Sequence, residues 1–172
     1  MKRKTAIAIS IIFFISLVNL IQAKGEENMK IKSPEFENGQ NIPSKFTCEG
    51  EDVNPALTIE DIPEGTKSLS LIVDDPDAPV GLWVHWVVFD IPPASRMEEN
   101  NIPGKQGINS ARGMNYHGPC PPSGTHRYFF KIYALDAVLN LKEGISKAQL
   151  ENAMQGHILD KAELVGLYKR KR

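Results

Sequence analysis

Frequent interruption by proline and glycine is the feature that most constrains the fold of this chain. Its 172 residues include 12 prolines and 13 glycines, which divide the sequence after residue 30 into short apolar runs. Short strands joined by turns are typically bounded by these two residues. The chain shows no internal repeat, low-complexity tract or linker beyond that point. The sequence therefore predicts one β-rich domain with many turns.

Two apolar runs are the strongest strand candidates. The first covers residues 84–91 and stops at a pair of prolines, and the second covers residues 126–135. Side chains alternate between the two faces of a strand. One face of the first strand should therefore carry His85, Val87, Phe89 and Ile91. One face of the second should carry His126, Tyr128, Phe130 and Ile132. Neither run alternates cleanly between polar and apolar residues, so we expect both faces of both strands to be covered.

Weaker strand candidates and one helix complete the pattern. Further strands are predicted at residues 29–33, 56–60, 67–74 and 161–168. A helix is predicted from Ser146 to Ile158, because Ser146 and Gln149 have the spacing of a capping box. Apolar side chains then recur at helical spacing along one face. One helix among many strands predicts a mostly β domain.

The N-terminus has the composition of an export signal. Basic residues come first, an apolar run follows as far as residue 21, and small and polar residues come after it. This order predicts a secretory signal peptide at residues 1–23, cleaved after Ala23. Residues 24–172 would then form a single domain that is periplasmic or secreted. An uncleaved membrane anchor is the alternative, although the run is short for a span and contains polar residues.

Net charge excludes one class of function, and the cysteines leave a question open. A formal net charge of −1 argues against binding of nucleic acid, which usually needs a strongly basic surface. Cys48 and Cys120 are the only cysteines, and an oxidising compartment would permit a disulfide between them. Two separate buried thiols are the alternative. The sequence alone does not say whether the two Cα atoms lie close enough to be linked.

Acidic, imidazole and phenol groups gather at the ends of the predicted strands. Asp75 and Asp77 follow one strand, on backbone stiffened by prolines. His85 lies in an apolar strand, and His126 and Tyr128 share one face of another. Polar groups beside stiff loops favour a small preformed pocket for a polar or anionic ligand. Each group also has a purely structural explanation, because Asp-Pro-Asp is common in turns and a single histidine is common in a core.

Three motifs, in this order, resemble the phosphatidylethanolamine-binding protein family and its bacterial Raf-kinase-inhibitor-like branch. They are Asp75-Pro-Asp-Ala-Pro79, His85-Trp-Val-Val-Phe-Asp-Ile-Pro92 and Gly118-Pro-Cys-Pro-Pro-Ser-Gly-Thr-His-Arg-Tyr128. The resemblance extends from about residue 31 to residue 168. It implies an antiparallel β-sandwich of a large and a small sheet, with a few peripheral helices, one of them near residues 146–158.

The same resemblance implies a function. It predicts a non-enzymatic protein, without a cofactor or a bound metal, whose pocket takes phosphate-like anions or phospholipid head groups. The residues that match the pocket of the family are Asp75, Asp77, His85, Gly118, His126 and Tyr128. Two carboxylates repel a phosphate, so we expect the two aspartates to orient the two histidines and to hold them cationic by raising their pKa. Backbone N–H groups of the Gly118 loop would add a small anion-binding nest.

Other functions are weaker alternatives on the same residues. An exported inhibitor or signalling partner of a kinase or protease is the first, by analogy with related proteins. A hydrolase that uses Ser123 near His126 is less favoured, because Gly-x-Ser-x-Gly is absent and Ser123 lies in a turn-like segment. A metal site is disfavoured by the dispersed spacing of the candidate ligands. The exposed face of the long loop at residues 92–125 is a candidate homodimer surface.

Overall fold

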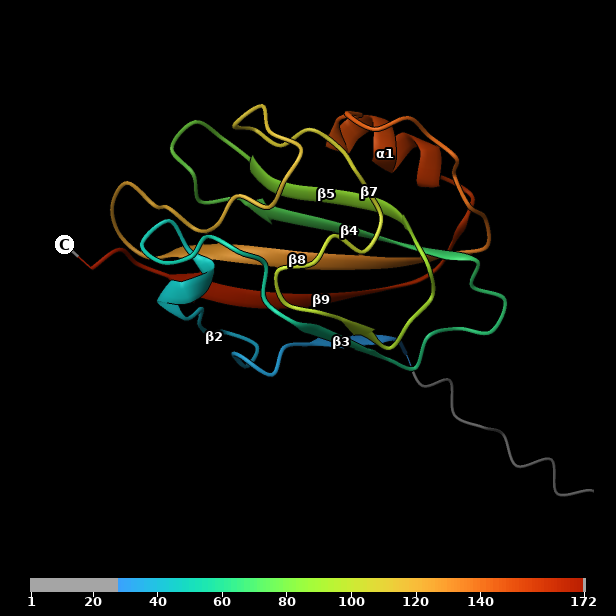
Figure 1. The fold of residues 1–172 in the computed structure, drawn as a ribbon, viewed down its shortest axis with the longest axis horizontal. Coiled ribbons are helices and arrows are strands. Elements are labelled where there is room, and N and C mark those ends of the chain that lie inside the picture. Colours follow the sequence, from blue (N-terminus) through green and yellow to red (C-terminus); the bar gives the residue numbers. More distant parts are fainter. Residues whose placement is uncertain (1–27, 172) are drawn as a thin grey trace, which may run out of the picture.

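The computed structural model describes residues 28–171 and consists of two packed β-sheets with one α-helix (Figure 1). The large sheet has six strands in the order β2-β9-β8-β4-β5-β7, and the small sheet has three in the order β1-β3-β6. The predicted sandwich of a large and a small sheet is therefore confirmed. The predicted signal peptide at residues 1–23 lies outside the described residues.

Long central strands and short edge strands make up the large sheet. Its members are β2 (Gln40–Asn41), β4 (Ser68–Asp75), β5 (Trp83–Ile91), β7 (Lys105–Gln106), β8 (His126–Leu135) and β9 (Ile158–Tyr168). The small sheet contains β1 (Lys30–Lys32), β3 (Leu57–Glu60) and β6 (Arg96–Met97). The helical segments are the 3₁₀ turn η1 (Ser44–Phe46) and the helix α1 (Lys147–Met154). The paired strands run antiparallel, except that β2 pairs in parallel with β9.

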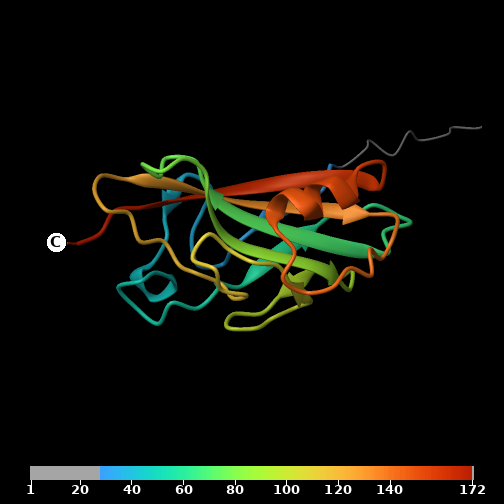
Figure 2. The same cartoon turned by 90° about the horizontal axis from the view of Figure 1, so that it is seen from above.

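Two hydrophobic clusters cover the two faces of the large sheet. The first lies between the sheets and includes Leu71 and Phe130 from the large sheet and Ile59 from the small one. The second lies between the large sheet and α1 and includes Phe89 and Leu150. Figure 2 shows α1 lying along the sheet on this second side. The strands β4 and β5 are therefore covered on both faces, as the lack of polar alternation predicted for β5, whereas the face of β8 turned away from the small sheet is only partly buried.

Helix α1 begins at the predicted capping box. The Ser146 hydroxyl accepts a hydrogen bond from the Gln149 N–H, and the Gln149 side chain accepts one from the Ser146 N–H. The helix ends at Met154, before the predicted Ile158, because Gly156 turns the chain at a φ of 79° and Ile158 already begins β9. Within residues 28–171, no helix is long and apolar enough to cross a membrane.

Candidate functional site

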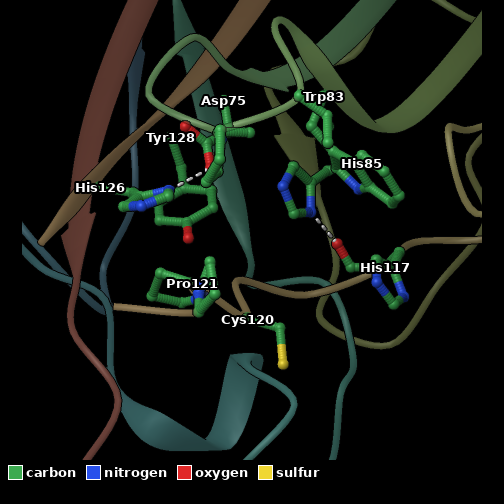
Figure 3. Close-up of a pocket in the computed structure, with 12 residues that line it drawn as sticks. Asp75, Trp83, His85, His117, Cys120, Pro121, His126 and Tyr128 are labelled. Carbon is green, nitrogen blue, oxygen red and sulfur yellow. Dashed lines mark hydrogen bonds and ion pairs between the residues drawn. The ribbon is translucent and has the colours of Figure 1, made fainter. Parts of the chain in front are cut away.

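A cavity of about 260 Å³ opens at one end of the large sheet (Figure 3). Antiparallel pairing brings the end of β4 beside the beginnings of β5 and β8, and the loop before β8 closes the space. The polar lining consists of Asp75, His85, His117, His126 and Tyr128, and the apolar lining of Ala78, Pro79, Val80, Trp83, Cys120, Pro121 and Pro122. The fold thus brings four of the six predicted site residues to one cavity, and leaves Asp77 and Gly118 outside its lining.

Asp75 and His126 form a buried pair in the wall of this cavity. Strand alternation sends the neighbouring carboxylate, Asp74, to the opposite face, where Lys131 donates to it at 2.7 Å. The Asp75 Oδ2 accepts from Nδ1 of His126 at 2.7 Å, and its Oδ1 accepts from the Asp77 N–H at 2.7 Å. The side chains of Asp75 and His126 are only 4% and 8% exposed. One predicted carboxylate–imidazole pair therefore forms.

Asp77 binds an arginine and leaves the second imidazole without a carboxylate. Arg127 donates to the two Asp77 carboxylate oxygens from Nε at 2.9 Å and from a terminal nitrogen at 2.7 Å, and its backbone N–H adds a third bond at 2.9 Å. These bonds lower the pKa of Asp77 to about 2. The predicted pairing of Asp77 with a histidine is therefore wrong. The Asp77 carboxylate ties the turn after β4 to β8, beside the cavity.

A β-bulge turns His85 toward the cavity. Val73 of β4 pairs with Trp86, whereas the next residue, Asp74, pairs with Val84, so His85 has no partner of its own on β4. Val84 packs in the cluster beneath α1, and Trp86 packs between the sheets. His85, which lines the cavity, therefore points to the same side as Trp86. The predicted shared face of His85, Val87, Phe89 and Ile91 is therefore wrong: Val87 and Phe89 face α1, this bulge re-aims His85, and Ile91 packs between the sheets beyond a second register shift.

His85 is held by a backbone carbonyl, and its ring is kept neutral. Its Nδ1 donates to the carbonyl oxygen of His117 (Figure 3), and the residue is only 3% exposed. Burial is the largest cause that lowers the pKa of His85 to about 4, because it disfavours the charged ring. The prediction that a carboxylate holds His85 cationic is therefore wrong. Its other ring nitrogen, Nε2, is buried without a hydrogen-bond partner among the described residues.

Among the described residues that line the cavity, Tyr128 supplies a second buried polar atom without a partner. Its hydroxyl has no hydrogen-bond partner at normal distance and angle within the described part of the chain. The backbone of Cys120 lies close to this hydroxyl and acts to lower its pKa, but this effect is smaller than that of burial. Burial and the nearby carboxylates raise the pKa of Tyr128, so its hydroxyl stays protonated. The edge of one ring meets the face of the other where Tyr128 packs on His85, with centroids 5.1 Å apart. The two orphan polar atoms therefore belong to side chains in direct contact.

The loop wall of the cavity is attached to the segment around η1. A disulfide joins Cys48 to Cys120 with the Cα atoms 5.4 Å apart, which confirms the disulfide alternative. The Gly118 N–H donates to Asp52 Oδ1 at 2.6 Å, and the Tyr116 hydroxyl donates to the Phe46 carbonyl at 3.0 Å. The predicted nest therefore does not include the Gly118 N–H. A β-carbon at Gly118 would lie 2.6 Å from the Phe46 oxygen, so close packing explains this glycine.

Sequence reasoning missed several residues of the lining. His117 lines the cavity and also fixes His85 through its carbonyl group. Its place in a loop gave no periodic signal, although it directly precedes the Gly118 motif. Trp83 lies two residues before His85, and residues two apart in a strand share a face, so alternation would have placed Trp83 on the same face as His85. Ser123, the nucleophile of the hydrolase alternative, is exposed and lies outside the lining.

Metal ligands do not cluster here. Among residues 28–171, no group of three or more His, Cys, Asp or Glu side chains is arranged to hold a metal ion. Within the cavity, Asp75 is already bonded to His126, and His85 has its Nδ1 engaged. The polar groups of the cavity are therefore arranged as hydrogen-bonding partners.

The fold and the cavity together define a β-sandwich protein with a pocket at one end of its larger sheet. The chain belongs to the phosphatidylethanolamine-binding protein family, whose model matches residues 32–169. It is 49% identical over 150 residues to a UPF0098 protein of Methanothermobacter thermautotrophicus, an alignment that covers 83% of this chain and 99% of the relative. The predicted family resemblance is confirmed.

Two solved structures share this fold. A phosphatidylethanolamine-binding protein homologue from Chlamydia trachomatis matches with a TM-score of 0.82 at 44% identity, covering 84% of this chain and 99% of the other. The structure of E. coli YbcL, described as a new member of the mammalian family, matches with a TM-score of 0.77 at 29% identity and the same coverage of 84% and 99%. The sandwich is therefore common to relatives of moderate sequence identity.

Proposed function

We propose that this is a non-enzymatic binding protein whose cavity takes a small phosphate-like anion, such as a phosphate ester or a phospholipid head group. The observation that supports this most is the pair of buried orphan atoms at the cavity, His85 Nε2 and Tyr128 Oη. A buried polar group without a hydrogen bond costs about 1–3 kcal/mol. Native proteins contain few such groups. A polar ligand that bonded to both atoms would remove this cost.

The chemistry around the orphan atoms favours an oxyanion attached to a carbon group. The Tyr128 hydroxyl can donate to an anionic oxygen, and His126 adds a positive charge beside the cavity when its ring is protonated. The apolar lining, which includes Pro79, Trp83 and Pro121, offers a surface for the carbon part of an ester. The name of the matched family supports a phospholipid head group as one form of this ligand.

Titration calorimetry with phenyl phosphate near pH 6 tests the proposal. We expect saturable binding to the full chain, and a loss of tenfold or more in affinity in His126→Ala. The matched control is His157→Ala, because His157 also pairs with an aspartate, Asp136 at 2.8 Å, but is exposed and lies outside the cavity lining. That control should bind like the wild type. Absence of saturable binding to the wild type would overturn the proposed function.

The same samples test the non-enzymatic part of the proposal. Phenyl phosphate incubated with the wild type should release inorganic phosphate no faster than with His126→Ala. Ser123→Ala serves as a second comparison, because that hydroxyl is the one that the hydrolase alternative requires. Phosphate release that exceeds the background and disappears in Ser123→Ala would contradict a pure binding function.

We propose further that the mature protein is exported. The disulfide between Cys48 and Cys120 supports this, because disulfides persist mainly in oxidising compartments. Intact mass spectrometry of protein from fractionated cells tests it. We expect a mass that lacks residues 1–23 in the exported fraction. A full-length mass found only in the membrane fraction would support the uncleaved anchor instead.

A further inference from the structure

The tautomer of His85 is fixed by its backbone partner. A carbonyl oxygen can only accept a hydrogen bond, so the Nδ1 that contacts the His117 carbonyl must carry the hydrogen. The His117 ring stacks on the His85 ring with centroids 5.8 Å apart and planes within 16°. Tyr128 contacts the His85 ring edge-on. A ring turned over by 180° would lose the bond to the His117 carbonyl, so Nδ1 stays on that side and Nε2 faces the side of Tyr128 (Figure 3).

The free nitrogen of His85 is therefore a hydrogen-bond acceptor. Burial keeps the ring neutral, because the pKa of His85 falls to about 4. In the neutral ring with hydrogen on Nδ1, Nε2 presents a lone pair and no hydrogen. An anionic oxygen also presents only lone pairs, so it cannot form a hydrogen bond with this atom. The ligand atom opposite Nε2 must carry a hydrogen.

The charges that face His85 also disfavour a doubly charged ligand. Asp75 of β4 and Asp52 of the segment after η1 place negative charge near the ring. His126 and Tyr128 of β8 and His117 of the loop complete the titratable groups around the cavity. Tyr128 is neutral, so positive charge can come only from protonated His126 or His117 within this described lining. A monoanion is therefore accommodated with less repulsion than a dianion.

We propose that the cavity selects a phosphate monoester in its protonated, singly charged form, over phosphate diesters and sulfate esters of similar shape. This rests on the proposed anion site. The P–OH of the monoester donates to His85 Nε2, and one of its anionic oxygens accepts from the Tyr128 hydroxyl. A diester and a sulfate ester carry the same single charge but have no hydrogen to donate. Among the phosphate-like anions, the preferred occupant of the cavity is then a monoester, and the diester head group of an intact phospholipid binds less tightly.

Three probes that share a phenyl group test this selectivity. They are phenyl phosphate, methyl phenyl phosphate and phenyl sulfate, titrated calorimetrically into the wild type at pH 5, where each is mainly a monoanion. The second pKa of a phosphate monoester is about 6. We expect phenyl phosphate to bind roughly tenfold more tightly than either of the others, the order of magnitude of one hydrogen bond to a charged partner.

A pH series separates the proton of the ligand from the protons of the protein. Phenyl sulfate stays a monoanion throughout, so changes in its affinity report only on groups of the protein. The ratio of phenyl phosphate affinity to phenyl sulfate affinity should fall as the pH rises from 5 to 7.5, because the monoester loses its hydrogen near pH 6. A ratio that stays constant or rises over this range would overturn the proposal.

His85→Gln tests the assigned acceptor. A glutamine amide can turn either its oxygen or its NH₂ group toward a ligand, so this variant should bind phenyl phosphate and phenyl sulfate within about threefold of each other. Loss of preference, and not loss of binding, is the expected signature. If the variant fails to fold, the three-probe comparison on the wild type still decides.

The two proposals fail in different ways. Failure of all three probes to bind the wild type would overturn the anion site itself. Binding of phenyl sulfate or methyl phenyl phosphate as tightly as phenyl phosphate would keep the anion site and overturn the selectivity. A preference for the monoester that survived unchanged in a folded His85→Gln would also overturn it, because the hydrogen would then be recognised elsewhere.

Discussion

The two walls of the cavity are held in place by different means. The strand wall, made of Asp75, Trp83, His85, His126 and Tyr128, is part of the backbone ladder of the large sheet. The loop wall, made of His117, Cys120, Pro121 and Pro122, is joined to its surroundings by a few long-range links, including the disulfide. Four of the five polar lining side chains lie on the strand wall. The loop wall closes the space and fixes the orientation of His85.

Removal of the disulfide that anchors the loop wall should have the largest effect on stability, because it frees the unfolded chain from a long-range restraint. The bond joins residues separated by 72 positions. A cross-link over a loop of this length stabilises a protein by about 4 kcal/mol, chiefly by restricting the unfolded chain. We expect the double variant Cys48→Ala/Cys120→Ala to lose stability of that order in urea titrations. A loss below about 1 kcal/mol would contradict this expectation and would mean that the cross-link restricts the unfolded chain very little.

Acid should weaken the strand wall through His85. Its pKa is about 4 in the folded protein, against 6.5 for an ordinary histidine. The unfolded chain therefore takes up a proton as the pH falls below 6.5, while the folded protein does not until near pH 4. Stability from the neutral ring is complete above pH 6.5 and is lost as the pH falls to 4, with a total on the order of 3 kcal/mol.

Urea titrations of the wild type and of His85→Gln between pH 7 and 4 would measure this loss. The variant lacks the buried imidazole, so its stability should fall less over the same interval, and its remaining pH dependence reports on the other titrating groups. Equal losses in the two proteins would mean that His85 does not titrate as its burial implies.

Gly118→Ala should destabilise the loop wall by about 1–3 kcal/mol, the usual cost of overpacking. A β-carbon there would lie 2.4 Å from Asp52 Oδ1 and 2.6 Å from the Phe46 carbonyl oxygen. Thermal or urea unfolding measures the loss, and Ser123→Ala, at an exposed position of the same loop, is the control. An unchanged midpoint in Gly118→Ala would show that the contact between the loop wall and the η1 segment is loose.

Asp77→Asn should have the smallest effect. The carboxylate binds Arg127, but that side chain is 54% exposed, and exposed ion pairs contribute about 1 kcal/mol or less. Because the pKa of Asp77 is lowered to about 2, its contribution is present above pH 4 and is lost as the pH falls through 2. The variant should therefore be slightly less stable than the wild type at pH 7, and the difference should shrink as the pH falls from 4 to 2. A difference that stays the same from pH 4 to pH 2 would require another cause.

Much of the strand and helix pattern was predictable from the sequence, because local physics determines it. The apolar run that became β8 matches its predicted bounds, and its inward face carries Tyr128, Phe130 and Ile132. Ser146 and Gln149 cap α1 because a capping box satisfies backbone groups within one turn. The three motifs also identified the family, whose model matches residues 32–169 and so includes all three of them.

Only the tertiary structure decided how the candidate groups are paired. The bulge at His85 depends on its register with β4, and the choice of Arg127 as the partner of Asp77 depends on the adjacency of β8. The His117 carbonyl reaches His85 from 32 residues away. The sequence by itself thus determined which chemical groups lie at the ends of the strands that form the cavity. Strand formation and the spacing of residues along a strand are local properties of the chain. Their charge states and partners were decided by folding, because burial and hydrogen bonding depend on neighbours distant in the chain.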